Sequence, residues 1–152
     1  MHFPYDLDFK KVDFRKRPDR YNVGKGEQGV LMVEPYKSEI LPFWRFKTPD
    51  IAQKSAKKIY SLFLTYKAKK DFVGMDMARK FLQMGYTRSR RYANHSSGKK
   101  YDSRGKIYPK AEDWNTNEKA KSARIFYEFY FKAKENKVYK KVKESKVLRK
   151  PR

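Results

Sequence analysis

The sequence predicts an α+β fold in which a short N-terminal antiparallel hairpin or small sheet packs on four to five helices. Two runs rich in β-branched and aromatic residues, at positions 30–34 and 41–47, have the composition of strands. After residue 48 the apolar side chains instead recur at three- and four-residue spacing, which is typical of helices with one buried face. Gly85 divides one of these helical stretches and predicts a helix-glycine turn-helix unit.

Length and composition predict a single basic domain over residues 1–152. The chain is 39% hydrophobic and 16% aromatic, so it can bury one core built largely from Phe and Tyr. We expect a folded core over about residues 3–135 and a basic C-terminal helix or frayed tail over about residues 136–152. Near the N-terminus, residues 3–21 alternate aromatic and charged positions, a period-two pattern that predicts an extended strand or arm.

The two strand candidates are separated by a segment with turn-forming residues around Pro35. A short connection of this kind favours antiparallel pairing of the two strands. In the second strand, Phe43 and Arg45 would face one side of the sheet while Trp44 and Phe46 face the other. We expect Trp44 to belong to the core.

The motif G-x-G-x-x-G occurs at residues 24–29. A dinucleotide-binding fold needs a helix after this motif, but the run that follows it has strand character, which excludes that interpretation. The chain also lacks the HRD and DFG motifs of protein kinases. We interpret the motif as the turn of a β-hairpin. The alternative is a loop in which Lys25 and Gly26 contact a phosphate without catalysis.

Two long helices are predicted from their start signals. Thr48-Pro49-Asp50 combines a capping threonine, a proline at the first helical position and an acid in the first turn, and the helix should reach about Lys70. Asn115 with Glu118 resembles a capping box and predicts a helix to about Glu135. A last helical pattern covers the basic residues at the C-terminus.

The stretch from Asp71 to His95 joins apolar and charged residues. Asp71 is placed to cap a helix that Gly85 ends, and Thr87 to cap a second, basic helix. Three arginines would then lie in the first turn of the second helix, where the helix dipole disfavours cations, so a bound phosphate would offset their charge. The alternative is that carboxylates of the same fold pair with these arginines, which are Arg88, Arg90 and Arg91.

The chain is strongly basic, since 39 Lys and Arg against 17 Asp and Glu give a formal net charge of +22. Such an excess of cations is typical of proteins that bind a polyanion, most commonly nucleic acid. No apolar stretch is long enough to cross a membrane, and the N-terminus lacks the apolar run of a signal peptide. The absence of cysteine excludes disulfides and thiolate zinc sites and favours a cytoplasmic location.

The strongest internal run of positive charge extends from Arg88 to Lys110, and tyrosines are interleaved with it. Cations and aromatic rings in one segment are typical of surfaces that hold nucleic acid. We therefore predict a non-enzymatic nucleic-acid-binding protein, with duplex DNA favoured as its partner. The predicted contact residues are Arg88, Arg90, Arg91, Tyr92, Asn94, His95, Lys99, Lys100, Tyr101 and Arg104.

Two alternatives stay open. A basic interaction protein that docks on an acidic host protein, such as transcription machinery, needs the same positive surface. A metal-dependent nuclease needs clustered carboxylates, and the candidates Asp19, Glu27, Glu34 and Glu39 lack the spacing of a nuclease motif. We therefore predict no catalytic residue, no metal site and no cofactor. The sequence predicts no particular oligomeric state.

Three stretches carry a resemblance to a known family: DFRKRPDRYNVG, GKGEQGVLMVEPYKSEILPFWRFKTP and DFVGMDMARKFLQMGYTRSRRYANH. Over roughly residues 3–135 the chain resembles an uncharacterised domain-of-unknown-function family found in bacteria, some eukaryotes and tailed phages of cyanobacteria. The resemblance implies no activity and assigns no catalytic residue. The short, lysine-rich chain is more similar to the phage members, which implies a phage-encoded protein in the cytoplasm or nucleoid of a host cell.

Overall fold

The computed structural model describes residues 9–24 and 26–149, and their regular structure is helical. No sheet is present in this part of the chain, so the predicted α+β class is wrong. Five α-helices and two short 3-10 helices follow one another in the described residues: η1 (Pro18–Arg20), α1 (Tyr36–Ile40), η2 (Leu41–Phe43), α2 (Pro49–Ala68), α3 (Phe72–Asn94), α4 (Glu118–Lys134) and α5 (Lys137–Arg149).

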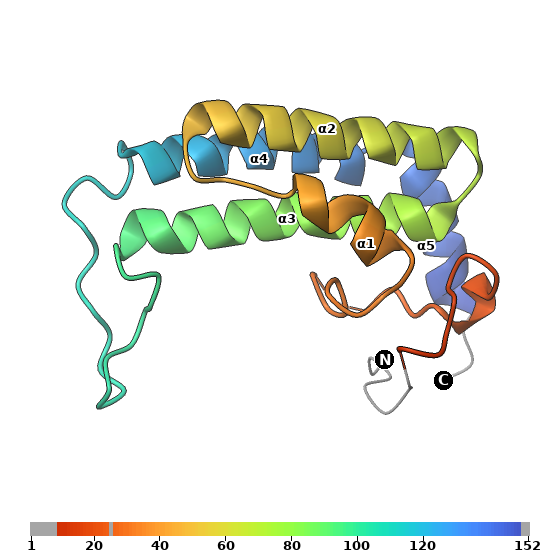
Figure 1. Cartoon of the computed structure of the whole chain (residues 1–152), viewed down its shortest axis with the longest axis horizontal. Helices are drawn as coiled ribbons and strands as arrows, with labels where there is room; N and C mark the ends of the chain where they lie inside the picture. The colour runs from red at the N-terminus through yellow and green to blue at the C-terminus, as the bar shows by residue number, and fades with distance from the viewer. Residues whose placement is uncertain (1–8, 25, 150–152) are drawn as a thin grey trace.

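Three long helices, α2, α3 and α4, lie side by side and form the body of the molecule (Figure 1). Helix α3 runs antiparallel to the other two and contacts both of them, as well as α1 and α5. The N-terminal segment, residues 9–24 and 26–35, lies on one side of α3, and its first part lies at the same end of α3 as α5. The long connection between α3 and α4 projects from the opposite end.

The core is built around α3, most of whose side chains are buried up to Gly85. Aromatic residues from the N-terminal part of the chain and from α1, α2, α4 and α5 pack in the same core, as the composition predicts. Tyr139 of α5 stacks on Phe72 at a ring-centroid distance of 5.6 Å, and Phe14 of the N-terminal segment is also buried. Helix α5 and the N-terminal segment are therefore parts of the same core as the three long helices.

The predicted starts of α2 and α3 are confirmed. The Thr48 side chain accepts a hydrogen bond from the backbone N–H of Ile51 at 3.3 Å, and the Asp71 side chain accepts one from Gly74 at 3.0 Å. For α4 the predicted cap is wrong, because Asn117 and not Asn115 accepts the hydrogen bond from the backbone of Ala120.

Both predicted strands are wrong for local reasons. Residues 27–32 form successive turns, and the apolar side chains of Val30 and Val33 are buried in the core directly. In the second segment, residues 41–43 form η2 and not a strand. Ser55 of α2 then forms hydrogen bonds with backbone groups at the end of η2 and just after it. Its hydroxyl donates to the Phe43 carbonyl at 2.6 Å and accepts from the Arg45 N–H at 2.9 Å, so no partner strand is needed.

The helix-glycine turn-helix unit is also wrong, because α3 continues without interruption through Gly85. A Cβ atom on this glycine would lie 2.3 Å from Cδ1 of Phe126, which is buried on α4. Gly85 therefore permits the close approach of two helices and does not end one. Thr87 caps no second helix; its hydroxyl is 2.6 Å from a carboxylate oxygen of Glu27 and donates a hydrogen bond to it.

We expect Gly85→Ala to destabilise the protein, although alanine is the better helix former. The added methyl group collides with the buried Phe126 ring, and overpacking of this kind costs about 1–3 kcal/mol. Urea unfolding followed by circular dichroism measures the change. The exposed substitution Gln53→Ala on α2 is the control and should shift the midpoint little. A more stable Gly85→Ala protein would show that the two helices do not meet here.

Candidate nucleic-acid interface

The connection between α3 and α4, residues 95–117, is here called the basic arm. It projects beyond the C-terminal end of α3 (Figure 1) and is anchored at its base. The Ala111 N–H donates to the carbonyl of Asn94 at 2.8 Å, and the Asn117 side-chain amide donates to the carbonyl of Ala93 at 2.9 Å. Both contacts tie the returning half of the arm to the last turn of α3, so the arm has a fixed root.

The outer part of the basic arm folds back on itself like a hairpin. Tyr101 and Ile107 form an antiparallel bridge, and the Asp102 N–H donates to the Lys106 carbonyl at 2.8 Å. The Asp102 carboxylate accepts hydrogen bonds from the backbone N–H groups of Arg104 and Lys106. Asp102 is therefore used to hold the turn together, although it is the one acid near the tip.

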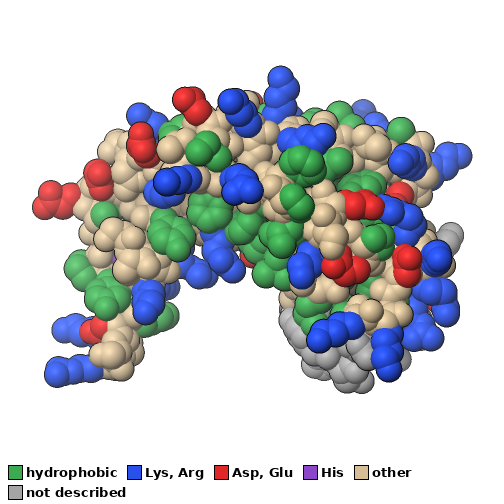
Figure 2. All heavy atoms as spheres, in the orientation of Figure 1, with side chains coloured by type: hydrophobic (Ala, Val, Ile, Leu, Met, Phe, Trp, Pro, Cys, Tyr) green, Lys and Arg blue, Asp and Glu red, His purple; other side chains and the backbone are tan. Residues whose placement is uncertain are grey.

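The cations of the basic arm are exposed, and none of them forms an ion pair with a carboxylate in the described part of the chain. Figure 2 shows Lys and Arg side chains gathered at the tip of the projecting arm, and the surface is hollowed between the arm and the N-terminal segment. Two of the lysines lie over rings of the arm itself, Lys100 over Tyr101 and Lys110 over Trp114. The five exposed cations are Lys99, Lys100, Arg104, Lys106 and Lys110.

The predicted arginines lie in the last two turns of α3, and this corrects the electrostatic argument made for them. At a helix C-terminus the dipole favours cations, so the three arginines there need no phosphate to offset an unfavourable field. Arg90 is engaged within the protein: it donates to the carbonyl of Trp114 at 3.0 Å and to the side-chain oxygen of Asn94. Arg91 is exposed and Arg88 is half-buried.

The remaining predicted residues at the end of α3 divide into exposed and buried. Tyr92 is exposed, and its ring packs beside Phe46 and against Gly98. Asn94 is half-buried, and its side-chain oxygen accepts a hydrogen bond from Arg90. His95 is only 8% exposed, and a buried imidazole cannot reach a phosphate on the surface. Arg91 and Tyr92 are therefore exposed at the end of α3 where the arm begins, whereas His95 is buried.

The G-x-G-x-x-G loop is not the turn of a β-hairpin in the described residues, and its contact with a phosphate stays a prediction. Lys25 lies outside the described residues. Gly26 is exposed, but its carbonyl oxygen accepts a hydrogen bond from Arg79 of α3 at 2.5 Å. The carbonyl oxygen of Gln28 accepts another from Lys80 at 2.6 Å. Two backbone carbonyl groups of the loop thus bind cations of α3. These hydrogen bonds attach the loop to the core.

Arg79 and Lys80 belong to a buried polar cluster that the sequence did not predict. Its centre is Asp76, which is fully buried and lies 2.7 Å from Nη2 of Arg79 and 3.7 Å from Nζ of Lys80. The hydroxyl groups of Tyr21 and Tyr139 both donate hydrogen bonds to the same carboxylate. One carboxylate therefore joins α3 to the N-terminal segment and to α5.

Burial and charge act in opposite directions on this cluster. Burial alone would raise the pKa of Asp76, but the charges of Arg79 and Lys80 and the hydrogen bonds from the two tyrosines lower that pKa to about 2. Burial lowers the pKa of Lys80 to about 8, against the attraction of Asp76. All three charged residues are at most 3% exposed, so we assign the cluster to the fold.

We expect acid to destabilise the protein as Asp76 becomes protonated. Its pKa is lower in the folded chain, about 2, than the ordinary value of 3.8, so the stabilisation is complete above pH 4 and is lost as the pH falls through 2. A shift of this size corresponds to about 2 kcal/mol. Urea unfolding between pH 7 and pH 2 measures the loss, and NMR titration of the side-chain carboxyl carbon assigns it. Titration of that carbon near 3.8 would contradict the assignment.

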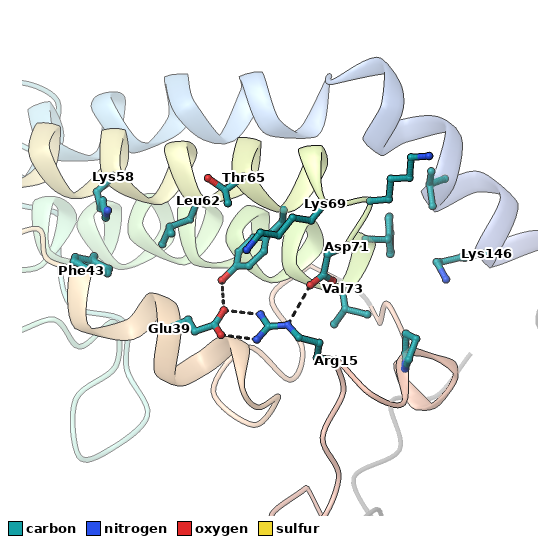
Figure 3. Close-up of a pocket in the computed structure, with 15 residues that line it drawn as sticks. Arg15, Glu39, Phe43, Lys58, Leu62, Thr65, Lys69, Asp71, Val73 and Lys146 are labelled. Carbon is teal, nitrogen blue, oxygen red and sulfur yellow. Dashed lines mark hydrogen bonds and ion pairs between the residues drawn. The ribbon is translucent and has the colours of Figure 1, made fainter.

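A second positive region surrounds a cavity of about 990 Å³ at the other end of α3, here called the basic pocket (Figure 3). Its two carboxylates share one arginine, because Arg15 pairs with Glu39 at 2.7 Å and lies 3.6 Å from Asp71. The Glu39 carboxylate accepts hydrogen bonds from Nη1 and Nη2 of Arg15, each at 2.7 Å, and from the Tyr66 hydroxyl. The Asp71 carboxylate accepts one from the Tyr36 hydroxyl. Four lysines of the lining remain without an ion pair to a described carboxylate: Lys58, Lys69, Lys70 and Lys146.

The four carboxylates considered for a nuclease are engaged separately. Asp19 pairs with Arg17, and Glu39 with Arg15. Glu27 accepts from Thr87, and Glu34 accepts from the hydroxyl and N–H of Ser38. Among residues 9–24 and 26–149, no group of three or more acidic or histidine side chains is arranged to hold a metal ion. Each of these carboxylates therefore has its own hydrogen-bond or ion-pair partner within the protein.

No helix in the described part of the chain combines the length and the apolar character needed to cross a membrane. In the comparison with known proteins, the family model described as domain of unknown function (DUF4385) matches residues 4–148. No curated protein and no solved structure matches the chain. The resemblance to an uncharacterised domain family is thus confirmed. Since the match covers nearly the whole sequence, the chain belongs to the DUF4385 family.

Proposed function

We propose that this protein binds nucleic acid without catalysis and that its basic arm contacts the phosphates of duplex DNA. The observation that supports this most strongly is the arm itself, a projecting segment with five exposed cations and no carboxylate paired to them in the described chain. Like charges held close together repel one another in the free protein, and a polyanion removes that cost. The net charge of +22 points in the same direction.

The shape of the arm fits a groove of the duplex. Two backbone segments run side by side at its outer end, and the major groove of B-form DNA, about 12 Å wide, admits a two-stranded ribbon. Arg91 and Tyr92 lie near its root, where they would contact the adjacent backbone. Phosphate contacts of this kind position a protein without reading sequence, so we expect weak sequence preference.

The basic pocket supplies positive charge at the opposite end of α3, so a long polyanion has a second place to bind. An acidic partner protein would use the same cations. A cytoplasmic or nucleoid location suits a DNA-binding protein and is part of this proposal. The phage origin implied by the resemblance stays a prediction.

Competition separates DNA from an acidic protein as the partner. A fluorescein-labelled duplex of about 20 base pairs is bound to the full chain and followed by fluorescence anisotropy. Unlabelled duplex and poly-L-glutamate, matched in total negative charge, then compete for it. We expect the duplex to compete at least about tenfold better, because its phosphates are fixed at the spacing that the arm contacts. Equal competition would reject DNA as the preferred partner.

A further inference from the structure

A groove between α3 and α4 is lined by exposed aromatic rings, which the proposed contact with duplex DNA does not use. It is a cavity of about 770 Å³ between the two helices and the root of the basic arm, here called the aromatic groove. Its lining residues come from α3 (Tyr86, Arg90), the arm (Trp114, Asn115) and α4 (Arg124, Tyr127, Glu128, Phe131, Lys132).

Large rings of this groove are exposed to solvent. Tyr127 is 42% exposed, Phe131 is 47% exposed and Trp114 is 39% exposed. The rings of Tyr127 and Phe131 lie at an interplanar angle of 28° with their centroids 6.3 Å apart, and Tyr86 lies 5.0 Å from Tyr127. Exposed aromatic rings are costly in water, and a flat ring of a ligand can stack on them.

The charge of the groove selects the kind of flat ligand. Three cations line it, Arg90, Arg124 and Lys132, against one carboxylate, Glu128. Arg90 lies 5.6 Å from the centre of the Trp114 ring, and Lys110 of the arm lies 4.6 Å from the same ring. Aromatic rings bordered by cations match a base carried on a phosphate backbone. Continuity with the basic arm, through Trp114 and Asn115, places the groove beside the proposed phosphate contacts.

We propose that the aromatic groove stacks the unpaired bases of single-stranded nucleic acid. This inference rests on the proposed function and adds a strand preference to it. The bases of an intact duplex expose only their edges, so their faces cannot stack in the groove, whereas a single strand presents both faces. Single strands or frayed duplex ends therefore occupy the groove, while the arm holds the phosphates that follow.

The test compares one variant on two ligands. Tyr127→Ala/Phe131→Ala removes two exposed rings and leaves the cations in place. Binding of labelled oligo-dT and of a labelled duplex is measured by anisotropy at one salt concentration, with circular dichroism to establish folding. We expect affinity for oligo-dT to fall by about tenfold or more, with little change for the duplex. The control variant Leu64→Ala/Val138→Ala removes exposed apolar groups outside the groove and should change neither affinity.

A second measurement reports on the groove without removing its rings. The chain has two tryptophans, so Trp44→Phe leaves Trp114 as the single indole reporter. We expect oligo-dT to quench Trp114 fluorescence at the concentrations where it binds, because a base stacks beside that ring. The stacking inference is overturned if oligo-dT does not quench Trp114 and if Tyr127→Ala/Phe131→Ala loses no affinity, or equal affinity, for oligo-dT and duplex. The proposed function would then remain intact. A chain that binds neither ligand overturns both.

Discussion

Replacing Asp76 with alanine is expected to lower the free energy of unfolding by about 3–5 kcal/mol. The substitution leaves the guanidinium of Arg79 and the ammonium of Lys80 buried without their carboxylate. It also removes the acceptor of two buried phenols, Tyr21 and Tyr139. Domains of this size are stable by about 5–15 kcal/mol, so we expect a large part of the stability to disappear. Urea unfolding at neutral pH, followed by circular dichroism, measures it.

The matched control is Asp19→Ala, which removes an exposed aspartate paired with Arg17 at 3.0 Å. Exposed pairs contribute little, so the unfolding midpoint should stay close to that of the unmodified protein. Similar midpoints for the Asp76 and Asp19 variants would show that the buried cluster does not hold the N-terminal segment and α5 to α3.

Removing the cations of the basic arm is expected to produce the largest loss of DNA affinity. The variant Lys99→Ala/Lys100→Ala/Arg104→Ala/Lys106→Ala changes four exposed side chains that form no ion pair with described carboxylates. Each phosphate contact contributes about −0.9 to the slope of log K against log salt, which corresponds to roughly eightfold in affinity at 0.1 M salt. Four contacts together predict a loss of about a thousandfold or more. Anisotropy titration of a labelled duplex measures it.

A control variant removes the same charge from another place. Lys57, Lys121, Lys137 and Lys141 are exposed lysines on α2, α4 and α5, and their replacement by alanine leaves the arm unchanged. We expect a loss of less than about tenfold, due to the lower net charge alone. Equal losses for the two variants would mean that total charge, and not the arm, determines binding.

Helix positions could be predicted from the sequence where the signal is local. The threonine, proline and acid at residues 48–50 and the aspartate at residue 71 act within one turn of the helix that they begin, so their pattern is sufficient. The continuation of α3 through Gly85 could not be predicted in this way. A glycine at a helix end and a glycine under a neighbouring ring have the same sequence signal, and only the position of Phe126 separates them.

The buried cluster could not be predicted for a related reason. Asp76, Arg79 and Lys80 have the spacing of an exposed ion-pair network on a helix, and their buried partners come from distant segments, such as Tyr21 and Tyr139. A signal was available, since all three charges fall within a helix that is apolar on most sides. The aromatic groove was missed because its rings belong to three separate segments.

The site prediction is changed most by the position of the arginines on α3. Because they lie at the C-terminal end of one long helix, the dipole argument for a phosphate no longer applies. The proposal that the protein binds nucleic acid now rests on the exposed cations of residues 99–110. They include the predicted Lys99, Lys100 and Arg104 and, in addition, Lys106 and Lys110.

The salt dependence of duplex binding tests the role of the arm most directly. Log K is measured against log salt between about 50 and 200 mM for the unmodified chain and for the four-residue arm variant. If the arm holds phosphates, the two slopes differ by about 3 to 4, close to 0.9 for each cation removed. Parallel lines for the two proteins would contradict it, because the arm would then release no counterions from DNA.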